Sequence, residues 1–75
     1  MRVISKDGNI NVPYEATVFC LIADGDEFSV AFRNPALTGY MPLATYETEE
    51  LAKSAFKSIV VAGETYTTNA VFYLT

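Results

Sequence analysis

One segment of the chain has clear helical periodicity, and it reads Thr48-Glu49-Glu50-Leu51-Ala52-Lys53-Ser54-Ala55-Phe56-Lys57-Ser58-Ile59. The segment opens with a hydroxyl N-cap, and the two carboxylates that follow suit the positive end of a helix dipole. Apolar residues three and four positions apart then form one face, namely Leu51, Ala52, Ala55, Phe56 and Ile59. Lys53 and Lys57 are interpreted as solvating the outer face. The segment predicts one amphipathic helix that ends near Gly63.

Short segments with high strand propensity lie before and after this helix in the sequence. The clearest turn between them is Asp7-Gly8, which is typical of a tight hairpin. Strands are expected at 2–5, 10–12, 16–23, 28–33, 41–46 and 70–74, with a loop at 34–40. The fourth strand alternates, with Phe28, Val30 and Phe32 inward and with Ser29, Ala31 and Arg33 outward. The sequence therefore predicts a single α+β domain over residues 1–75, an antiparallel β-meander with one amphipathic helix and a C-terminal strand.

The run from Ala16 to Ala23 is almost continuously apolar, which is typical of a strand that is buried on both faces. Since one helix covers one face of a sheet, the other face is expected to meet a second subunit or to lie under the loop at 34–40. A hydrophobic content of 51% also favours self-association of so short a chain. We therefore expect a homo-oligomer in which Cys20 is an inert structural thiol.

Ordinary side-chain catalysis is not expected, because the chain has no histidine and only one cysteine. General acid–base and nucleophilic catalysis depend on a group whose pKa lies near the working pH, most often histidine. The acidic groups have simpler roles in a turn (Asp24 and Asp26) and at the helix start (Glu47, Glu49 and Glu50). The lone cysteine excludes an internal disulfide or a zinc site. We expect no enzyme activity, no cofactor and no metal.

The charge pattern argues against binding to duplex nucleic acid. The net charge is −4, and the five basic residues are scattered along the chain. A duplex-binding protein gains most of its affinity from a basic face, whereas a small anionic ligand needs only one or two cations in a pocket. The sequence contains neither a membrane-spanning apolar stretch nor the apolar core of a signal peptide. We therefore expect a cytoplasmic protein with no membrane partner.

Three stretches of the sequence are similar to a group of small proteins from phages and prophages of Firmicutes. They are Met1-Arg2-Val3-Ile4-Ser5-Lys6-Asp7-Gly8-Asn9-Ile10-Asn11-Val12-Pro13-Tyr14-Glu15, Leu43-Ala44-Thr45-Tyr46-Glu47-Thr48-Glu49-Glu50 and Asn69-Ala70-Val71-Phe72. Within this group the chain resembles the anti-Thoeris cyclic-nucleotide sponges, phage proteins that sequester the cyclic ADP-ribose-type signal of a bacterial TIR-based immune system. The segment 62–69 is shorter than usual in the group, so a pocket built there does not carry over by resemblance.

The resemblance implies a homo-oligomer that holds a cyclic ADP-ribose isomer or a cyclic oligonucleotide without cleaving it, inside the bacterial host. Such a ligand needs aromatic faces for its bases and one or two arginines for its phosphates. The five phenylalanines are expected in the core, and the five tyrosines are better pocket or interface candidates. The candidate ligand-binding residues are Arg33, Asn34, Arg2, Asn69 and Tyr73. A solvated strand end, a surface position and a turn also explain Arg33, Arg2 and Asn69, respectively.

Two other functions fit the same sequence. One is a phage-encoded inhibitor that binds a host defence protein directly through a sheet edge or an acidic surface. The other is a small structural or accessory phage protein without a ligand.

Overall fold

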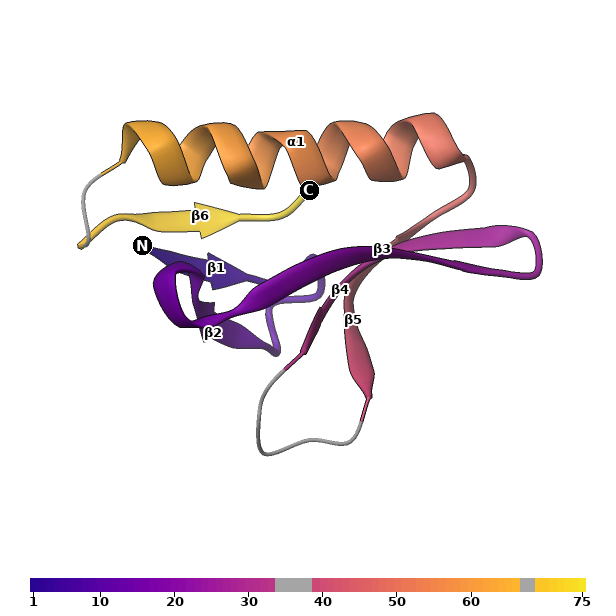
Figure 1. Cartoon of the computed structure of the whole chain (residues 1–75), viewed down its shortest axis with the longest axis horizontal. Helices are drawn as coiled ribbons and strands as arrows, with labels where there is room; N and C mark the ends of the chain where they lie inside the picture. The colour runs from indigo at the N-terminus through magenta and orange to yellow at the C-terminus, as the bar shows by residue number, and fades with distance from the viewer. Residues whose placement is uncertain (34–38, 67–68) are drawn as a thin grey trace.

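The structure is a computed structural model, and it describes residues 1–33, 39–66 and 69–75. Its elements are β1 (Arg2–Ile4), β2 (Asn11–Pro13), a 3-10 turn (Tyr14–Ala16), β3 (Val18–Asp24), β4 (Glu27–Arg33), β5 (Tyr40–Tyr46), α1 (Glu49–Thr65) and β6 (Val71–Tyr73), as Figure 1 shows. The predicted α+β class is confirmed, and so is the order of five strands, one helix and a last strand.

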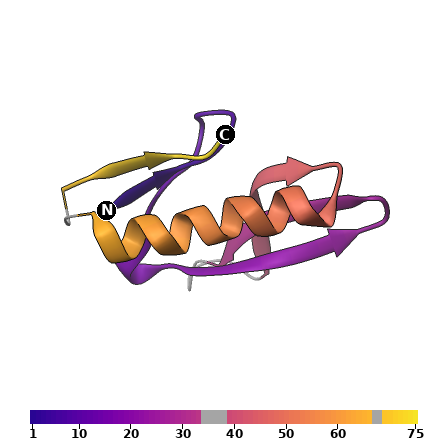
Figure 2. The same cartoon turned by 90° about the horizontal axis from the view of Figure 1, so that it is seen from above.

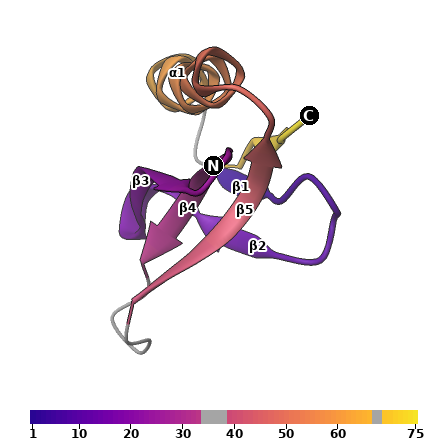
Figure 3. The same cartoon turned by 90° about the vertical axis from the view of Figure 1, so that its right-hand side faces the viewer.

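The strands are divided between two sheets of three strands each. β3, β4 and β5 form an antiparallel meander with β4 in the centre. In the other sheet β1 is central, antiparallel to β2 and parallel to β6. A parallel neighbour requires a crossover connection, which α1 provides here. The helix lies to one side of the strands and extends along both sheets, as the views in Figures 2 and 3 show.

A buried serine organises the hairpin between β1 and β2. Ser5 Oγ donates to Asp7 Oδ1 at 2.6 Å and accepts from the backbone N–H of Ile10 at 2.9 Å. The backbone N–H of Asn9 donates to the same carboxylate oxygen at 3.0 Å. Gly8 has a φ of 81°, a conformation that glycine adopts without strain. The turn predicted at Asp7-Gly8 is confirmed.

The helix begins as predicted but ends later. Thr48 Oγ1 accepts a hydrogen bond from the backbone N–H of Leu51 at 3.2 Å, which makes Thr48 the N-cap. The helix then continues through Gly63 to Thr65. A Cβ atom at Gly63 would lie 2.2 Å from Cζ of Tyr14. Gly63 therefore does not stop the helix, and its small size lets the Tyr14 ring pack against the helix backbone.

The core draws on both sheets and on the helix. Its buried members are Met1, Val3, Val12, Val30, Phe32, Leu43, Ala44, Ile59, Ala62 and Leu74. Of the five phenylalanines expected in the core, Phe32 alone is fully buried. Leu51 was expected on the apolar face of the helix but is 53% exposed. The buried stripe runs through Ala52, Ile59 and Ala62, and Leu51 lies at the flank of that stripe.

Residues 16–23 are only partly covered within the described part of the chain, and the predicted cover of their second face by a second subunit or by the loop at 34–40 stays a prediction. These residues supply β3, which is an edge strand of the meander and has no fully buried residue. Val18 is 61% exposed and Leu21 is 41% exposed. The central strand is β4, where residues 30–32 are buried. β5, which contains Pro42, lies at the other edge, as expected for a strand with a proline.

Candidate functional site

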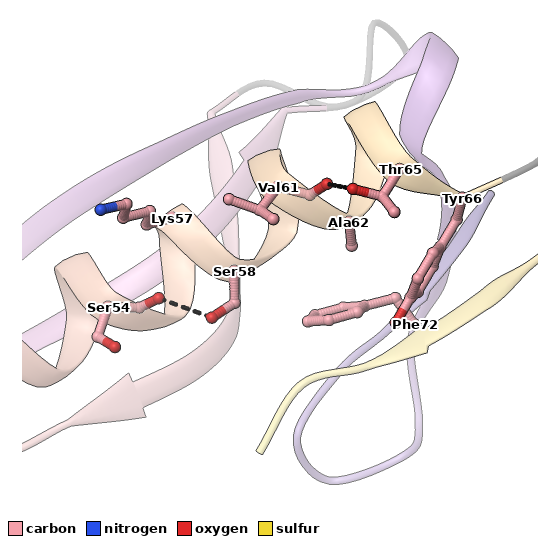
Figure 4. Close-up of a pocket in the computed structure, with 8 residues that line it drawn as sticks. All are labelled: Ser54, Lys57, Ser58, Val61, Ala62, Thr65, Tyr66 and Phe72. Atoms are coloured by element: carbon pink, nitrogen blue, oxygen red, sulfur yellow. Dashed lines mark hydrogen bonds between the residues drawn. The ribbon is translucent and has the colours of Figure 1, made fainter.

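A groove of about 440 Å³ lies between α1 and β6. It is lined by residues of α1 from Ser54 onward, the residue after the helix and one residue of β6, drawn in Figure 4: Ser54, Lys57, Ser58, Val61, Ala62, Thr65, Tyr66 and Phe72. The helical members recur mostly at intervals of three and four residues, which brings them to one face of α1. Phe72 reaches the groove from β6, where it is the register partner of the buried Val3 of β1.

Two aromatic rings give the groove its apolar surface. Figure 4 shows the Tyr66 and Phe72 side chains extending beneath the helix on the same side. Tyr66 is 51% exposed, and Phe72 is half-buried against the core. A flat ring with one accessible face is a suitable surface for stacking a nucleobase or another planar group.

The polar groups lie on the helix above these rings. Ser58 Oγ donates to the carbonyl oxygen of Ser54 at 2.9 Å, and Thr65 Oγ1 donates to that of Val61 at 2.8 Å. Both hydroxyl oxygens therefore keep lone pairs that can accept hydrogen bonds. Lys57 is a cation in the lining, and in Figure 4 its ammonium group points away from the two rings. Among the described residues of the lining there is no carboxylate, imidazole or thiol.

Three of the candidate residues from the sequence lie at the sheet of β1 and β6. Arg2 and Tyr73 are exposed and belong to the face of this sheet opposite to Phe72, since side chains alternate along a strand. Arg2 Nε donates to Asn11 Oδ1 at 2.7 Å, and Arg2 Nη2 donates to the Asn11 carbonyl oxygen at 3.2 Å. Asn69 is exposed at the turn before β6. The structure brings these residues to one sheet but not into the groove.

The other two candidate residues belong to the meander. Arg33 is exposed at the end of β4, in register with Tyr40 of β5 and Val18 of β3. Asn34 lies outside the described residues. Arg33 makes no ion pair with any other residue in the described part of the chain. Arg33 and Tyr40 therefore lie side by side at one end of the meander, and the structure places neither of them in the groove.

Sequence reasoning missed most of the groove. Lys57 was interpreted as a solvated helix residue and Phe72 as core, and only Tyr66 was among the aromatic candidates. The available signal was the small and polar stripe of Ser54, Ser58 and Thr65 at helical spacing, which leaves room beside a helix. Only the position of β6 beside α1 shows that this room faces an aromatic strand.

The groups whose pKa values shift have structural causes outside the groove. Burial raises the pKa of the Cys20 thiol and of the Tyr46 phenol. A hydrogen bond from the N-terminal ammonium, 2.7 Å from Glu15 Oε2, lowers the pKa of Glu15. Glu49, 2.6 Å from Lys53 Nζ, raises the pKa of Lys53. These shifts reflect burial and ion pairing and do not mark a reactive centre.

Within residues 1–33, 39–66 and 69–75, which the structure describes, no group of three or more His, Cys, Asp or Glu side chains is placed to hold a metal ion. No helix there has the length and apolar character needed to cross a membrane.

Comparison with known proteins found no matching family model, no similar curated protein and no similar solved structure. The resemblance to the phage sponges therefore depends on the three sequence stretches alone, and the functional argument depends on the groove.

Proposed function

We propose that this protein binds a cyclic nucleotide signal, either a cyclic ADP-ribose isomer or a cyclic oligonucleotide, and holds it without cleaving it, as a phage protein that evades host immunity. The observation that carries the proposal is the groove between α1 and β6, with two aromatic rings on one side and a lysine at its rim. The sequence resemblance supplies the class of ligand.

The size and chemistry of the groove support a nucleotide ligand. Its volume of about 440 Å³ falls within the range of small-molecule sites. Stacking of a base on an aromatic side chain stabilises binding by about 1–3 kcal/mol per base, and Tyr66 and Phe72 offer two rings for it. Lys57 has a long, exposed side chain whose ammonium group can turn toward a phosphate as a point charge.

The same lining supports sequestration rather than turnover. Cleavage of a glycosidic or phosphodiester bond needs a positioned base, acid, nucleophile or metal. As far as the structure describes the lining, the groove offers hydroxyl groups already engaged with the helix backbone, and no carboxylate or thiol. A bound ligand is therefore expected to be released intact when the protein unfolds.

Calorimetric titration of the purified protein with cyclic ADP-ribose isomers and with cyclic di- and trinucleotides tests the proposal. Heat denaturation of the complex followed by mass spectrometry checks that the ligand is unchanged. We expect binding at micromolar concentration or tighter and recovery of the original mass. If none of these ligands binds at micromolar concentration, the sponge function is wrong, and if the recovered ligand is altered, the protein is an enzyme.

Matched variants identify the site. We expect Tyr66→Ala and Lys57→Ala each to weaken binding by about tenfold or more, because they remove a stacking face and a phosphate contact. Lys53→Ala removes the same charge nearer the start of α1, and Tyr73→Ala removes a tyrosine from the opposite face of β6. Both controls should bind as the unmodified protein does. Weaker binding in Tyr73→Ala or Arg33→Ala, with Tyr66→Ala unaffected, would instead assign the ligand to the residues expected from the sequence.

Direct binding to a host defence protein is the second candidate function. It is favoured by apolar side chains at the edge strand β6 and the adjoining helix, where Val61, Val71 and Tyr73 are 50%, 46% and 67% exposed. Among the described strands β6 pairs only with β1, so its other edge can accept a strand from a partner. A protein that blocks the defence system in cells but binds no nucleotide would support this function.

A further inference from the structure

β3 has an open backbone edge beside α1. Among the described strands it pairs only with β4, so the other edge of this seven-residue strand has no strand partner. Asp24 and Glu27 close the hairpin across two residues, so this pair and every second pair after it exchange hydrogen bonds. The backbone groups of Phe19, Leu21 and Ala23 therefore point to the open edge.

The open edge of β3 lacks the features that keep a strand from pairing. Natural edge strands are protected by proline, by bulges, by charged side chains or by shortness. β5 contains Pro42, and β2 and β6 have three residues each. β3 has seven residues, no proline and no charged side chain before its last residue, Asp24. Of the strand edges in the described part of the chain, that of β3 is therefore best suited to accept an added strand.

α1 covers the meander unevenly and leaves the β3 side partly open. Leu21 points toward the helix, because its register partner Val30 belongs to the core. Leu21 is nevertheless 41% exposed, whereas Val30 is 0% exposed. Phe19, on the same face of β3, is half-buried. Figure 2 shows α1 running beside β3, and the seam between them is therefore apolar and incompletely filled.

Two hollows follow one another along this seam. One, of about 290 Å³, has Phe19, Phe56 and Val60 in its lining. The other, of about 190 Å³, has Leu21 and Ala52 in its lining. Phe19 and Leu21 are alternate residues of β3, and the side chains on one face of an added strand recur at the same interval. Two alternate side chains of such a strand therefore reach the two hollows, and the larger hollow suits an aromatic ring.

The end of the seam next to the hairpin turn is acidic. Asp24, Asp26 and Glu27 lie there, and none of them forms an ion pair within the described part of the chain. Asp24 and Glu27 are directly opposite each other, and like charges in opposed positions destabilise a ladder. A basic side chain opposite Asp24 on an added strand offsets this repulsion.

We propose that the seam between β3 and α1 binds an extended peptide segment of a partner protein, which adds to β3 as an antiparallel strand. The segment carries a basic residue opposite Asp24 and apolar residues opposite Leu21 and Phe19, whose side chains fill the two hollows. Main-chain hydrogen bonds hold such a strand, and the pockets for alternate side chains select its sequence.

A second copy of this chain does not fill the same seam. The side chains that its own β3 would bring to the helix side include Phe19, which is stacked on Tyr14 with ring centroids 5.8 Å apart. The seam also lies on the other flank of α1 from the nucleotide groove, since Val60 lines the seam and Val61 lines the groove. The inference therefore does not rest on nucleotide binding.

Fluorescence anisotropy of the full chain with a labelled heptapeptide, Lys-Thr-Thr-Val-Thr-Phe-Thr, tests the added strand. We expect binding in the micromolar range. Methylation of the valine backbone nitrogen should weaken binding by about tenfold or more, because this N–H donates to β3. The same methyl group on the next threonine should have little effect, because that N–H points away from β3. No binding at millimolar peptide, or equal losses from the two methyl groups, would overturn the proposal.

Matched variants locate the peptide. Val60→Glu places a charge in the larger hollow and should weaken peptide binding by about tenfold or more. Val61→Glu makes the same change on the groove side of α1 and should leave peptide binding intact. Asp24→Lys should reverse the charge preference, so that a peptide with glutamate in place of lysine binds better. The site is wrong if folded Val60→Glu binds as the unmodified chain does, or if Asp24→Lys still prefers lysine.

Sedimentation velocity of the free chain separates the peptide from a second copy at this edge. We expect Leu21→Asp to leave the oligomeric state unchanged while it weakens peptide binding. Dimerisation that Leu21→Asp abolishes would assign the β3 edge to a second copy and overturn the proposal. Peptide binding by a chain that binds no nucleotide would support the seam and overturn only the proposed nucleotide function.

Discussion

The two sheets differ in how the composition of a strand relates to its burial. β1 has three residues and begins with an exposed arginine, yet Val3 is 0% exposed and Ile4 is 9% exposed. β3 has seven residues, all apolar except the last, and none is fully buried. β1 is the central strand of its sheet, whereas β3 is at an edge. An apolar run shows what a strand is suited to bury, and strand order decides whether the chain itself buries it.

A charge introduced into β1, the central strand of its sheet, should have the largest effect on stability. Val3→Asp places a carboxylate where no water reaches, and an uncompensated buried charge costs about 3–5 kcal/mol. That is close to the whole stability of a domain this small, so we expect Val3→Asp to be unfolded. Leu21→Asp, on the edge strand, should lower the free energy of unfolding by less than about 1 kcal/mol.

Urea denaturation followed by circular dichroism measures both variants. Equal losses of stability at Val3 and Leu21 would mean that β3 is covered to the same extent as β1. A large loss of stability in Leu21→Asp, with none in Val3→Asp, would mean that β3 and not β1 is the buried strand.

The next largest effect is expected at the contact between the Tyr14 ring and Gly63 of α1. Tyr14 lies in the turn between β2 and β3, and its ring occupies the space where Gly63 would carry a Cβ atom. Gly63→Ala gains about 1 kcal/mol of helix propensity but overpacks the site, at a cost of about 1–3 kcal/mol. We expect a net loss of up to about 2 kcal/mol in the free energy of unfolding.

The double variant Tyr14→Ala with Gly63→Ala isolates this contact. Relative to Tyr14→Ala alone, the added methyl group should stabilise the chain, because only the helix propensity remains. Thermal unfolding of the four proteins in this cycle gives the coupling. Additive effects would show that the ring and the helix do not compete for the same space.

Substitution and chemical labelling of Cys20 measure how far β3 is shielded from water. Cys20→Ala should lower the stability by about 1 kcal/mol or less, because the thiol is only partly buried. Burial raises the pKa of this thiol, so native-state labelling by a thiol reagent should be slower than labelling of the unfolded chain. Labelling at the rate of an unfolded thiol would show that the Cys20 thiol is open to water in the native protein.

The smallest expected effect is a loss of stability at low pH through two carboxylates near the sheet that contains β1. Hydrogen bonds from the N-terminal ammonium and from Ser5 lower the pKa of Glu15 and Asp7, respectively. Their stabilisation is present above the ordinary pKa values of 4.5 and 3.8 and is lost as the pH falls through the lower folded values. Glu15→Gln should therefore be less stable than the unmodified chain at neutral pH, with the difference fading in acid. Parallel pH profiles in urea denaturation would contradict this assignment.

The candidate site shows where sequence reasoning reaches its limit. The sequence predicts Arg33 at the end of an alternating strand with its side chain outward, but it does not predict the register of Arg33 with Tyr40, which the sequence assigns to the loop at 34–40. The groove depends instead on Phe72 lying beside α1, and these elements meet only because β6 joins β1 in parallel. No spacing within either segment contains that information.

The amino-acid sequence by itself determined the local elements of this protein: the Asp7-Gly8 turn, the Thr48 N-cap, the amphipathic helix and the β-type runs around it. Each depends on backbone preferences and hydrogen bonds among residues a few positions apart. Only the tertiary structure decided that the strands form two sheets, that β3 is an edge strand, that Gly63 faces Tyr14 and that a groove opens beside β6. These features depend on which distant segments lie side by side, and many pairings of the same local elements bury a similar apolar area.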